Sequence, residues 1–86
     1  MDIELFADAI DDYKYWKKSG NIAVQKKIQR LFKSVKQSPY KGIGKPEPLK
    51  HDLSGKWSRR ITQKDKMVYE VVGKTIRVYS LKGHYN

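Results

Sequence analysis

The feature that most limits how this 86-residue chain can fold is an amphipathic stretch from residue 22 to residue 37. Its apolar side chains recur at helical spacing and form one stripe: Val24, Ile28, Leu31, Phe32 and Val35. Such a stripe predicts a helix that buries one face, while basic residues cover the rest. Asn21 is suited to cap its start, and Pro39 ends it.

Strand-like and helical runs surround this helix. Residues 2–6 read as a short edge strand and residues 7–18 as a first helix, while residues 57–62, 66–72 and 75–81 read as three further strands. Gly73 and Lys74 fit a tight hairpin turn between the last two. The order β-α-α-β-β-β predicts a single α+β domain over residues 1–86, with two helices on one face of a mainly antiparallel sheet. The other face would carry Arg60, Lys66 and Glu70.

The charge of the chain is strongly positive and unevenly spread. Nineteen lysines and arginines against nine acidic residues give a net charge of +10. Residues 1–20 hold five acidic and three basic residues, whereas residues 21–86 hold four acidic and sixteen basic ones. This polarity favours a polyanionic partner, namely nucleic acid, an anionic membrane or an acidic protein. The alternative reading is that the charge serves solubility alone.

Several classes of protein are disfavoured by what the sequence lacks. The chain has no cysteine, which excludes a disulfide scaffold and a thiol nucleophile. It has no signal-peptide pattern and no apolar run of about 20 residues, so we expect a cytoplasmic protein without a membrane partner. One histidine and one glutamate near a site do not make a metal site, and spacing such as HExxH is absent, so no metal and no cofactor are expected.

One carboxylate has an unusual setting. Glu47 stands between Pro46 and Pro48, and the segment from residue 41 to residue 66 holds eight lysines or arginines and three acidic residues. The prolines restrict the backbone and reduce the entropy lost when the side chain is held in place. A general base that meets its substrate at a fixed angle would benefit from this setting. Most glutamates between prolines are nevertheless turn residues.

Four segments together resemble one known family. DDYKYW (11–16), GKPEPLKHDLSGKWSRRIT (44–62), VYEV (68–71) and the terminal pair His84-Tyr85 are similar to the YoeB toxins of the RelE/ParE superfamily. The resemblance runs the length of the chain, and its central block is long and specific. It implies a fold like that of the small microbial ribonucleases. It also implies an endoribonuclease that cuts mRNA in the A site of a translating 70S ribosome.

The resemblance also assigns roles to residues. It implies Glu47 as general base, His84 as general acid and Tyr85 as the adjacent aromatic residue, with Arg60 contacting the reacting phosphate. Lys66 stands where the family commonly has a phosphate-stabilising arginine, and Asn86 extends the chain beyond the tyrosine at which many members end. Lys50 matches a residue near the substrate, and the expected RNA-binding set is Lys45, Lys50, His51 and Arg59.

These residues suit a cleavage reaction in which the RNA supplies its own nucleophile. The 2′-hydroxyl can attack the adjacent phosphate without metal or water, provided that a base, a cation and an acid are present. Glu47 would accept the 2′-OH proton, Arg60 with Lys66 would neutralise the phosphorane, and His84 would protonate the leaving 5′-oxygen.

Two other functions fit parts of the sequence. A non-enzymatic toxin that acts on a protein such as DNA gyrase, as ParE relatives do, would generally lack the glutamate and the terminal His-Tyr pair. A plain RNA-binding module explains the charge but gives no reason for the setting of Glu47. The expected protein partner is an acidic antitoxin of YefM type whose disordered segment folds on the basic surface. Tyr13, Tyr15 and Trp16 are expected to pack in the core or at a homodimer interface.

Overall fold

The computed structural model describes residues 1–83 of the chain. Its elements are β1 (Asp2–Leu5), α1 (Ala7–Lys18), α2 (Ile22–Gln37), β2 (Glu47–Pro48), a short 3-10 helix η1 (His51–Leu53), β3 (Trp57–Arg60), β4 (Lys66–Val72) and β5 (Thr75–Ser80). The two helices and the four long strands were all predicted from the sequence, with bounds that differ by two residues at most. The strand β2 was not predicted, because its two residues lie in a segment whose sequence is typical of a long loop.

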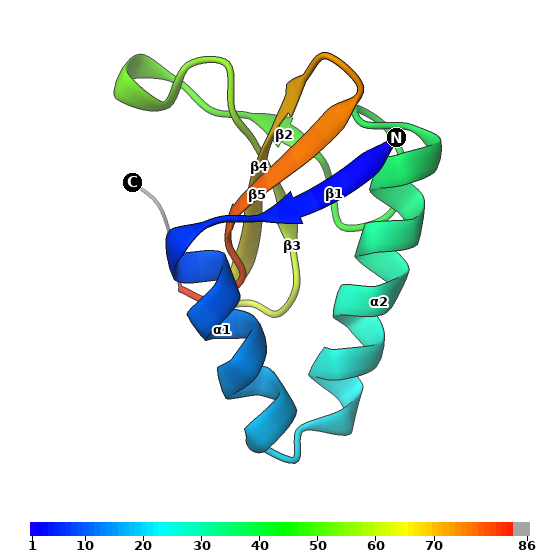
Figure 1. Cartoon of the computed structure of the whole chain (residues 1–86), viewed down its shortest axis with the longest axis vertical. Helices are drawn as coiled ribbons and strands as arrows, with labels where there is room; N and C mark the ends of the chain where they lie inside the picture. Colours follow the sequence, from blue (N-terminus) through cyan, green and yellow to red (C-terminus); the bar gives the residue numbers. More distant parts are fainter. Residues whose placement is uncertain (84–86) are drawn as a thin grey trace.

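The five strands form one mixed sheet in the order β1-β5-β4-β3-β2 (Figure 1). Only the β1–β5 pair is parallel, and the other three pairs are antiparallel. The last pair of the β4–β5 hairpin is Val72 with Thr75, so Gly73 and Lys74 form its two-residue turn. Gly73 has a φ of 61°, the left-handed conformation that glycine adopts most easily. The α+β fold and the hairpin are thereby confirmed.

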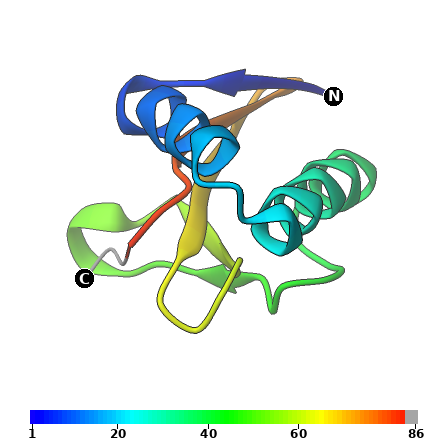
Figure 2. The same cartoon turned by 90° about the horizontal axis from the view of Figure 1, so that it is seen from below.

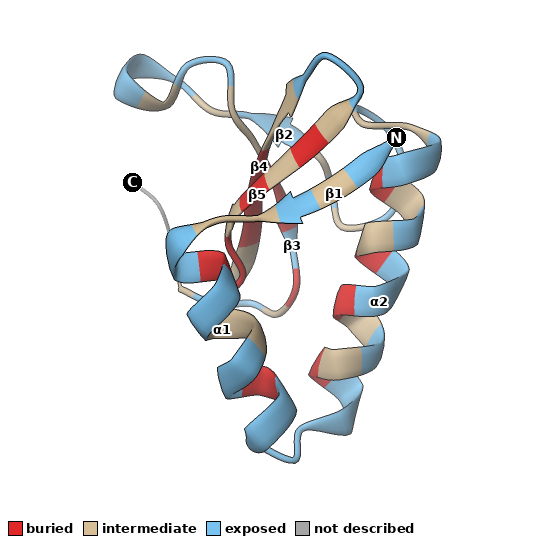
Figure 3. Ribbon diagram, viewed as in Figure 1, coloured by how far each residue is buried: buried red, intermediate tan, exposed pale blue. Residues whose placement is uncertain are grey.

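The core lies between the helices and one face of the sheet. Val24, Ile28, Leu31 and Val35 of α2 are buried, while Phe32 packs against the core from a half-buried position. The buried side of α2 faces the strands and its exposed side carries the basic residues (Figure 3). The N-cap is also as expected, because the Asn21 side chain accepts a hydrogen bond from the Val24 amide at 3.1 Å.

The first helix is tied to the residue that follows β5. The Leu81 amide donates to Asp12 Oδ2 at 2.9 Å, and Trp16 Nε1 donates to the Leu81 carbonyl at 2.8 Å. Burial raises the pKa of the Asp12 carboxyl, and the hydrogen bond from Leu81 partly offsets this. Trp16 is therefore a packing residue, as expected, and together with Asp12 it fixes the point at which the chain leaves the sheet.

Candidate nucleic-acid interface

Three of the predicted site residues lie on the sheet face opposite the helices. Glu47 pairs with Ser58, and Arg60 pairs with Lys66, in the antiparallel ladders of β2–β3 and β3–β4. Paired residues share a face, as do residues two apart in one strand, so Glu47, Arg60 and Lys66 point to the same side. Side chains directly opposite lie about 5 Å apart at Cβ, and diagonal neighbours about 7–8 Å apart. A carboxylate and two cations therefore lie on one face of three adjacent strands.

The conformation of the backbone that precedes Glu47 depends on a glycine. Gly44 has a φ of 84°, and a Cβ added there would lie 2.7 Å from Leu31 Cδ2 and 3.1 Å from Arg59 Cβ. The Arg60 amide donates to the Gly44 carbonyl at 2.6 Å. A side chain would therefore push this segment away from both α2 and β3. The glycine of the GKPEP motif thus seats the backbone that leads into β2.

The chain after β5 is directed toward Lys66. The Gly83 amide donates to Asp65 Oδ1 at 2.8 Å, and the Lys66 amide donates to the Gly83 carbonyl at 3.1 Å. Asp65 also accepts a 2.8 Å hydrogen bond from the Thr62 hydroxyl, so one carboxylate joins the β3–β4 turn to the end of the described chain. Gly83 immediately precedes His84 in the sequence. The predicted residues His84 and Tyr85, with Asn86, lie outside the described residues.

The expected RNA-contacting residues Lys45, Lys50 and His51 are all exposed. Lys45 and His51 have positive φ angles of 52° and 59°, which mark sharp turns on either side of β2. Residues 49–56 form a loop between β2 and β3, which we call the excursion. It is closed by a 2.8 Å hydrogen bond from the Leu49 amide to the Lys56 carbonyl. Figures 1 and 2 show this excursion on the side of the sheet away from α2, so its exposed residues lie on the same side as Glu47.

The sequence matches one family model over residues 6–85, described as the YoeB-like toxin of bacterial type II toxin–antitoxin systems. Toxin YoeB of Escherichia coli strain K12 is 47% identical over 75 residues, covering 87% of this chain and 88% of that protein. The chain belongs to the YoeB toxin family. The resemblance noted in the sequence is thereby confirmed.

Solved structures of YoeB toxins have the same fold. A YoeB/ParE toxin from Agrobacterium tumefaciens superposes with a TM-score of 0.93 at 38% identity, covering 99% of this chain and 100% of that one. YoeB in a YoeB–YefM complex from Staphylococcus aureus superposes with a TM-score of 0.88 at 41% identity, covering 99% and 98%. The agreement over nearly the whole chain confirms the two helices on a mixed sheet.

The predicted role of Arg59 is wrong for this YoeB family member. It was expected to contact RNA, but its side chain is fully buried. Its nitrogens donate to five oxygens: Tyr69 Oη at 3.2 Å, Ser34 Oγ at 2.8 Å, and the carbonyls of Ile43 at 3.3 Å, Ser38 at 2.6 Å and Lys41 at 2.8 Å. The alternation of β3 places Arg59 with Trp57 and opposite Arg60, and this signal could have identified it as a core residue.

A cluster that the sequence did not single out as a site lies farther along the same sheet face. The Tyr79 hydroxyl donates to Glu70 Oε1 at 2.8 Å, and Lys56 Nζ lies 5.1 Å from the centroid of the Tyr79 ring. We call Lys56, Glu70 and Tyr79 the loop seat, because Lys56 belongs to the 49–56 excursion and the other two to the sheet. Only the placement of Glu70 on this face was predicted. The loop seat depends on a long-range contact that no local motif signals.

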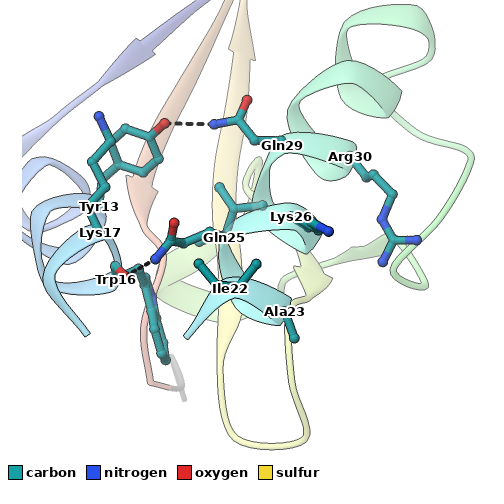
Figure 4. A pocket seen from close by; sticks show the side chains of 10 residues that line it. Tyr13, Trp16, Lys17, Ile22, Ala23, Gln25, Lys26, Gln29 and Arg30 are labelled. Carbon is teal, nitrogen blue, oxygen red and sulfur yellow. Dashed lines mark hydrogen bonds between the residues drawn. The ribbon is translucent and has the colours of Figure 1, made fainter. Parts of the chain in front are cut away.

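A groove of about 820 Å³ lies between α1 and α2. Figure 4 shows Gln25 and Gln29 of α2 reaching across it, with hydrogen bonds of 2.9 Å to the Trp16 carbonyl and 2.7 Å to Tyr13 Oη. None of the predicted catalytic or RNA-binding residues lines this groove. The groove is therefore separate from the face that carries Glu47, Arg60 and Lys66.

Two further observations concern residues 1–83. No group of three or more histidine, aspartate or glutamate side chains in this part of the chain is arranged to hold a metal ion. Neither of the described helices is long and apolar enough to cross a membrane.

Proposed function

We propose that this YoeB toxin is an endoribonuclease that cleaves mRNA on the translating ribosome and so inhibits translation in the cytoplasm. The reaction is attack of the 2′-hydroxyl on the adjacent phosphate. Single-stranded mRNA is a polyanion, and the chain offers it a net charge of +10. The observation that carries the proposal is the shared sheet face of Glu47, Arg60 and Lys66.

Each of these groups has one task. Glu47 accepts the proton of the 2′-hydroxyl as the oxygen attacks phosphorus. Arg60 and Lys66 stabilise the extra negative charge of the pentacoordinate phosphorus, Arg60 through a planar fork and Lys66 as a point charge. The bond from phosphorus to the 5′-oxygen breaks, and the family resemblance assigns the proton for that oxygen to His84. The products are a 2′,3′-cyclic phosphate and a 5′-hydroxyl.

The positions of the remaining residues are consistent with this reaction. Lys45, Lys50 and His51 are exposed around β2, where they can contact the phosphates or bases that flank the cleaved bond. Residues 81–83 are directed to the Lys66 end of the sheet by hydrogen bonds that Asp12 and Asp65 accept and that Trp16 and Lys66 donate. The family assignment of His84 and Tyr85 to the site requires the chain to arrive at this end.

The proposed protein partner is an acidic antitoxin of YefM type. The S. aureus relative is seen in a YoeB–YefM complex, and a YoeB dimer from the same organism has also been solved. We infer the same two kinds of contact for this chain, with an acidic segment of the antitoxin folding on the basic surface.

The test is cleavage of end-labelled mRNA by the purified protein, with and without programmed ribosomes. We expect cuts within the A-site codon that require ribosomes and leave a 2′,3′-cyclic phosphate, or the 3′-phosphate to which it opens. Replacing the 2′-hydroxyl of the cleaved nucleotide by hydrogen should abolish the cut. Cleavage of the 2′-deoxy substrate, or a product with a 5′-phosphate, would contradict the proposal. No cleavage together with inhibition of DNA gyrase would favour a ParE-like function.

A further inference from the structure

Strand β2 is held weakly by its own sheet contacts. It has two residues, lies at the edge of the sheet and pairs only with β3. Pro48 has no amide hydrogen to donate, which suits an edge strand. The position of Glu47 therefore depends also on the segments on either side of this short strand, Gly44 before it and residues 49–56 after it.

The segment after β2 is internally bonded, and its two ends adjoin β2 and β3. Within residues 49–56, the Leu53 amide donates to the Lys50 carbonyl at 3.2 Å and the Lys56 amide to the Leu53 carbonyl at 3.0 Å. The Leu49 amide donates to the Lys56 carbonyl at 2.8 Å, which joins the two ends. Because the ends are joined, a constraint on Lys56 is also a constraint on Leu49, two residues after Glu47.

The loop seat supplies this constraint. Lys56 lies over the Tyr79 ring, whose hydroxyl donates to Glu70. A Cβ added to Gly55 would lie 3.6 Å from Glu70 Oε2, so Gly55 faces the Glu70 carboxylate. Burial and the hydrogen bond to Glu70 raise the pKa of the Tyr79 hydroxyl. The excursion therefore contacts the sheet through the Lys56 cation on the Tyr79 ring, and Glu70 holds the hydroxyl of that ring.

We propose that the loop seat is a positioning device for the catalytic base, acting through Leu49 on Glu47. This inference rests on the proposed ribonuclease function for its catalytic part only. Lys56, Glu70 and Tyr79 do not touch the reacting atoms. They hold the excursion against the sheet, and the excursion holds β2 at its edge.

Two measurements on four variants test the proposal. The first is hydrogen exchange of the Leu49 amide in the free protein, which reports opening of the Leu49–Lys56 bond. Lys56→Gln and Tyr79→Leu should each raise this exchange about two- to fivefold, the range expected for one partly exposed cation–π contact. Lys56→Arg keeps the cation over the ring and should exchange like the wild type. The second is single-turnover cleavage on programmed ribosomes, in which the same two variants should be slower by roughly two- to fivefold.

Lys17→Gln is the matched control, because Lys17 Nζ lies 4.6 Å from the Tyr13 ring centroid, a contact of the same kind on α1. It should change neither measurement. The apparent affinity for programmed ribosomes should also stay unchanged in the Lys56 and Tyr79 variants, since positioning acts on the rate of the chemical step.

Several results would overturn the proposal. Unchanged Leu49 exchange would mean that the loop seat does not hold the excursion. Faster exchange with an unchanged cleavage rate would mean that it does not position Glu47. A slower rate in Lys56→Gln but not in Tyr79→Leu would mean that Lys56 contacts RNA directly. If the wild-type chain itself fails to cleave, the proposed function fails, while Leu49 exchange still decides whether the seat holds β2.

Discussion

At the scale of single residues, Glu47 is a strand residue and not a turn residue. It pairs with Ser58 at the edge of the sheet, and the edge position tolerates the proline that follows it. Its side chain is exposed, on the same face as Arg60 and Lys66. A carboxylate in this place can meet a substrate without any rearrangement of the core.

Glu47→Gln should fold normally and lose most of its cleavage activity. The amide keeps the shape of the side chain but cannot accept a proton, and catalytic bases contribute about 10²–10⁴-fold. The measurement is the single-turnover rate on programmed ribosomes, with thermal unfolding as the control for folding. A variant with full activity would remove Glu47 from the mechanism.

Lys66 tests how the phosphate charge is stabilised, because arginine is common at this position in the family. If the unit charge dominates, Lys66→Ala should be slow and Lys66→Arg should stay within a few-fold of the wild type. If the planar fork matters, Lys66→Arg should be faster, by roughly tenfold for each ~1.4 kcal/mol gained. We expect the charge-dominated result. An alanine variant that cuts at the wild-type rate would leave Arg60 alone with the phosphate.

At the scale of elements, β3 carries two adjacent arginines to opposite sides of the sheet. Arg59 is buried and bonded to the end of α2, to the following loop and to Tyr69 of β4. The Tyr69 hydroxyl in turn donates to the Pro39 carbonyl at 2.5 Å. Arg60 is exposed on the other face. Alternation along one strand therefore separates a structural arginine from a proposed catalytic one.

Arg59→Lys should consequently lower the stability of the protein, whereas Arg60→Lys should lower its cleavage rate. Lysine cannot reach the five oxygens around Arg59, so buried acceptors are left without donors, at a cost of about 1–3 kcal/mol each. For a chain of this size we expect the melting temperature to fall by more than about 10 °C. Arg60→Lys should melt within a few degrees of the wild type but cleave more slowly. Calorimetry and single-turnover kinetics on both variants would check this, and equal melting temperatures would contradict the structural role of Arg59.

At the scale of the whole molecule, the net charge of +10 is the sum of +12 on residues 21–86 and −2 on residues 1–20. Basic residues cover the exposed side of α2 and also surround β2 on the opposite side of the sheet. The molecule therefore presents positive charge to partners on two sides. This distribution would attract the proposed acidic antitoxin at long range.

Association with an acidic antitoxin should slow as salt is added. Electrostatic steering is screened over about 8 Å at physiological ionic strength, so the association rate constant should fall while the dissociation rate constant changes less. Stopped-flow mixing of the two proteins over a range of sodium chloride concentrations would measure both. An association rate that does not respond to salt would mean that the antitoxin binds away from the basic surface.

The sequence by itself determined the elements whose signals are local. The apolar stripe of α2, the Asn21 cap and the Gly73-Lys74 turn are each contained within a few neighbouring residues, so periodicity and turn chemistry were enough to predict them. The resemblance to YoeB toxins could also be recognised from the sequence, since it depends on the order of residues alone.

Only the tertiary structure decided where the segments between these elements lie. The pairing of Glu47 with Ser58, the burial of Arg59 and the contact of Lys56 with Tyr79 all join residues more than nine positions apart. Local periodicity carries no information about such contacts. Buried hydrogen-bond donors need acceptors, and a loop whose two ends are bonded to each other needs a contact that supports it. Both kinds of contact form only when the helices and strands have packed.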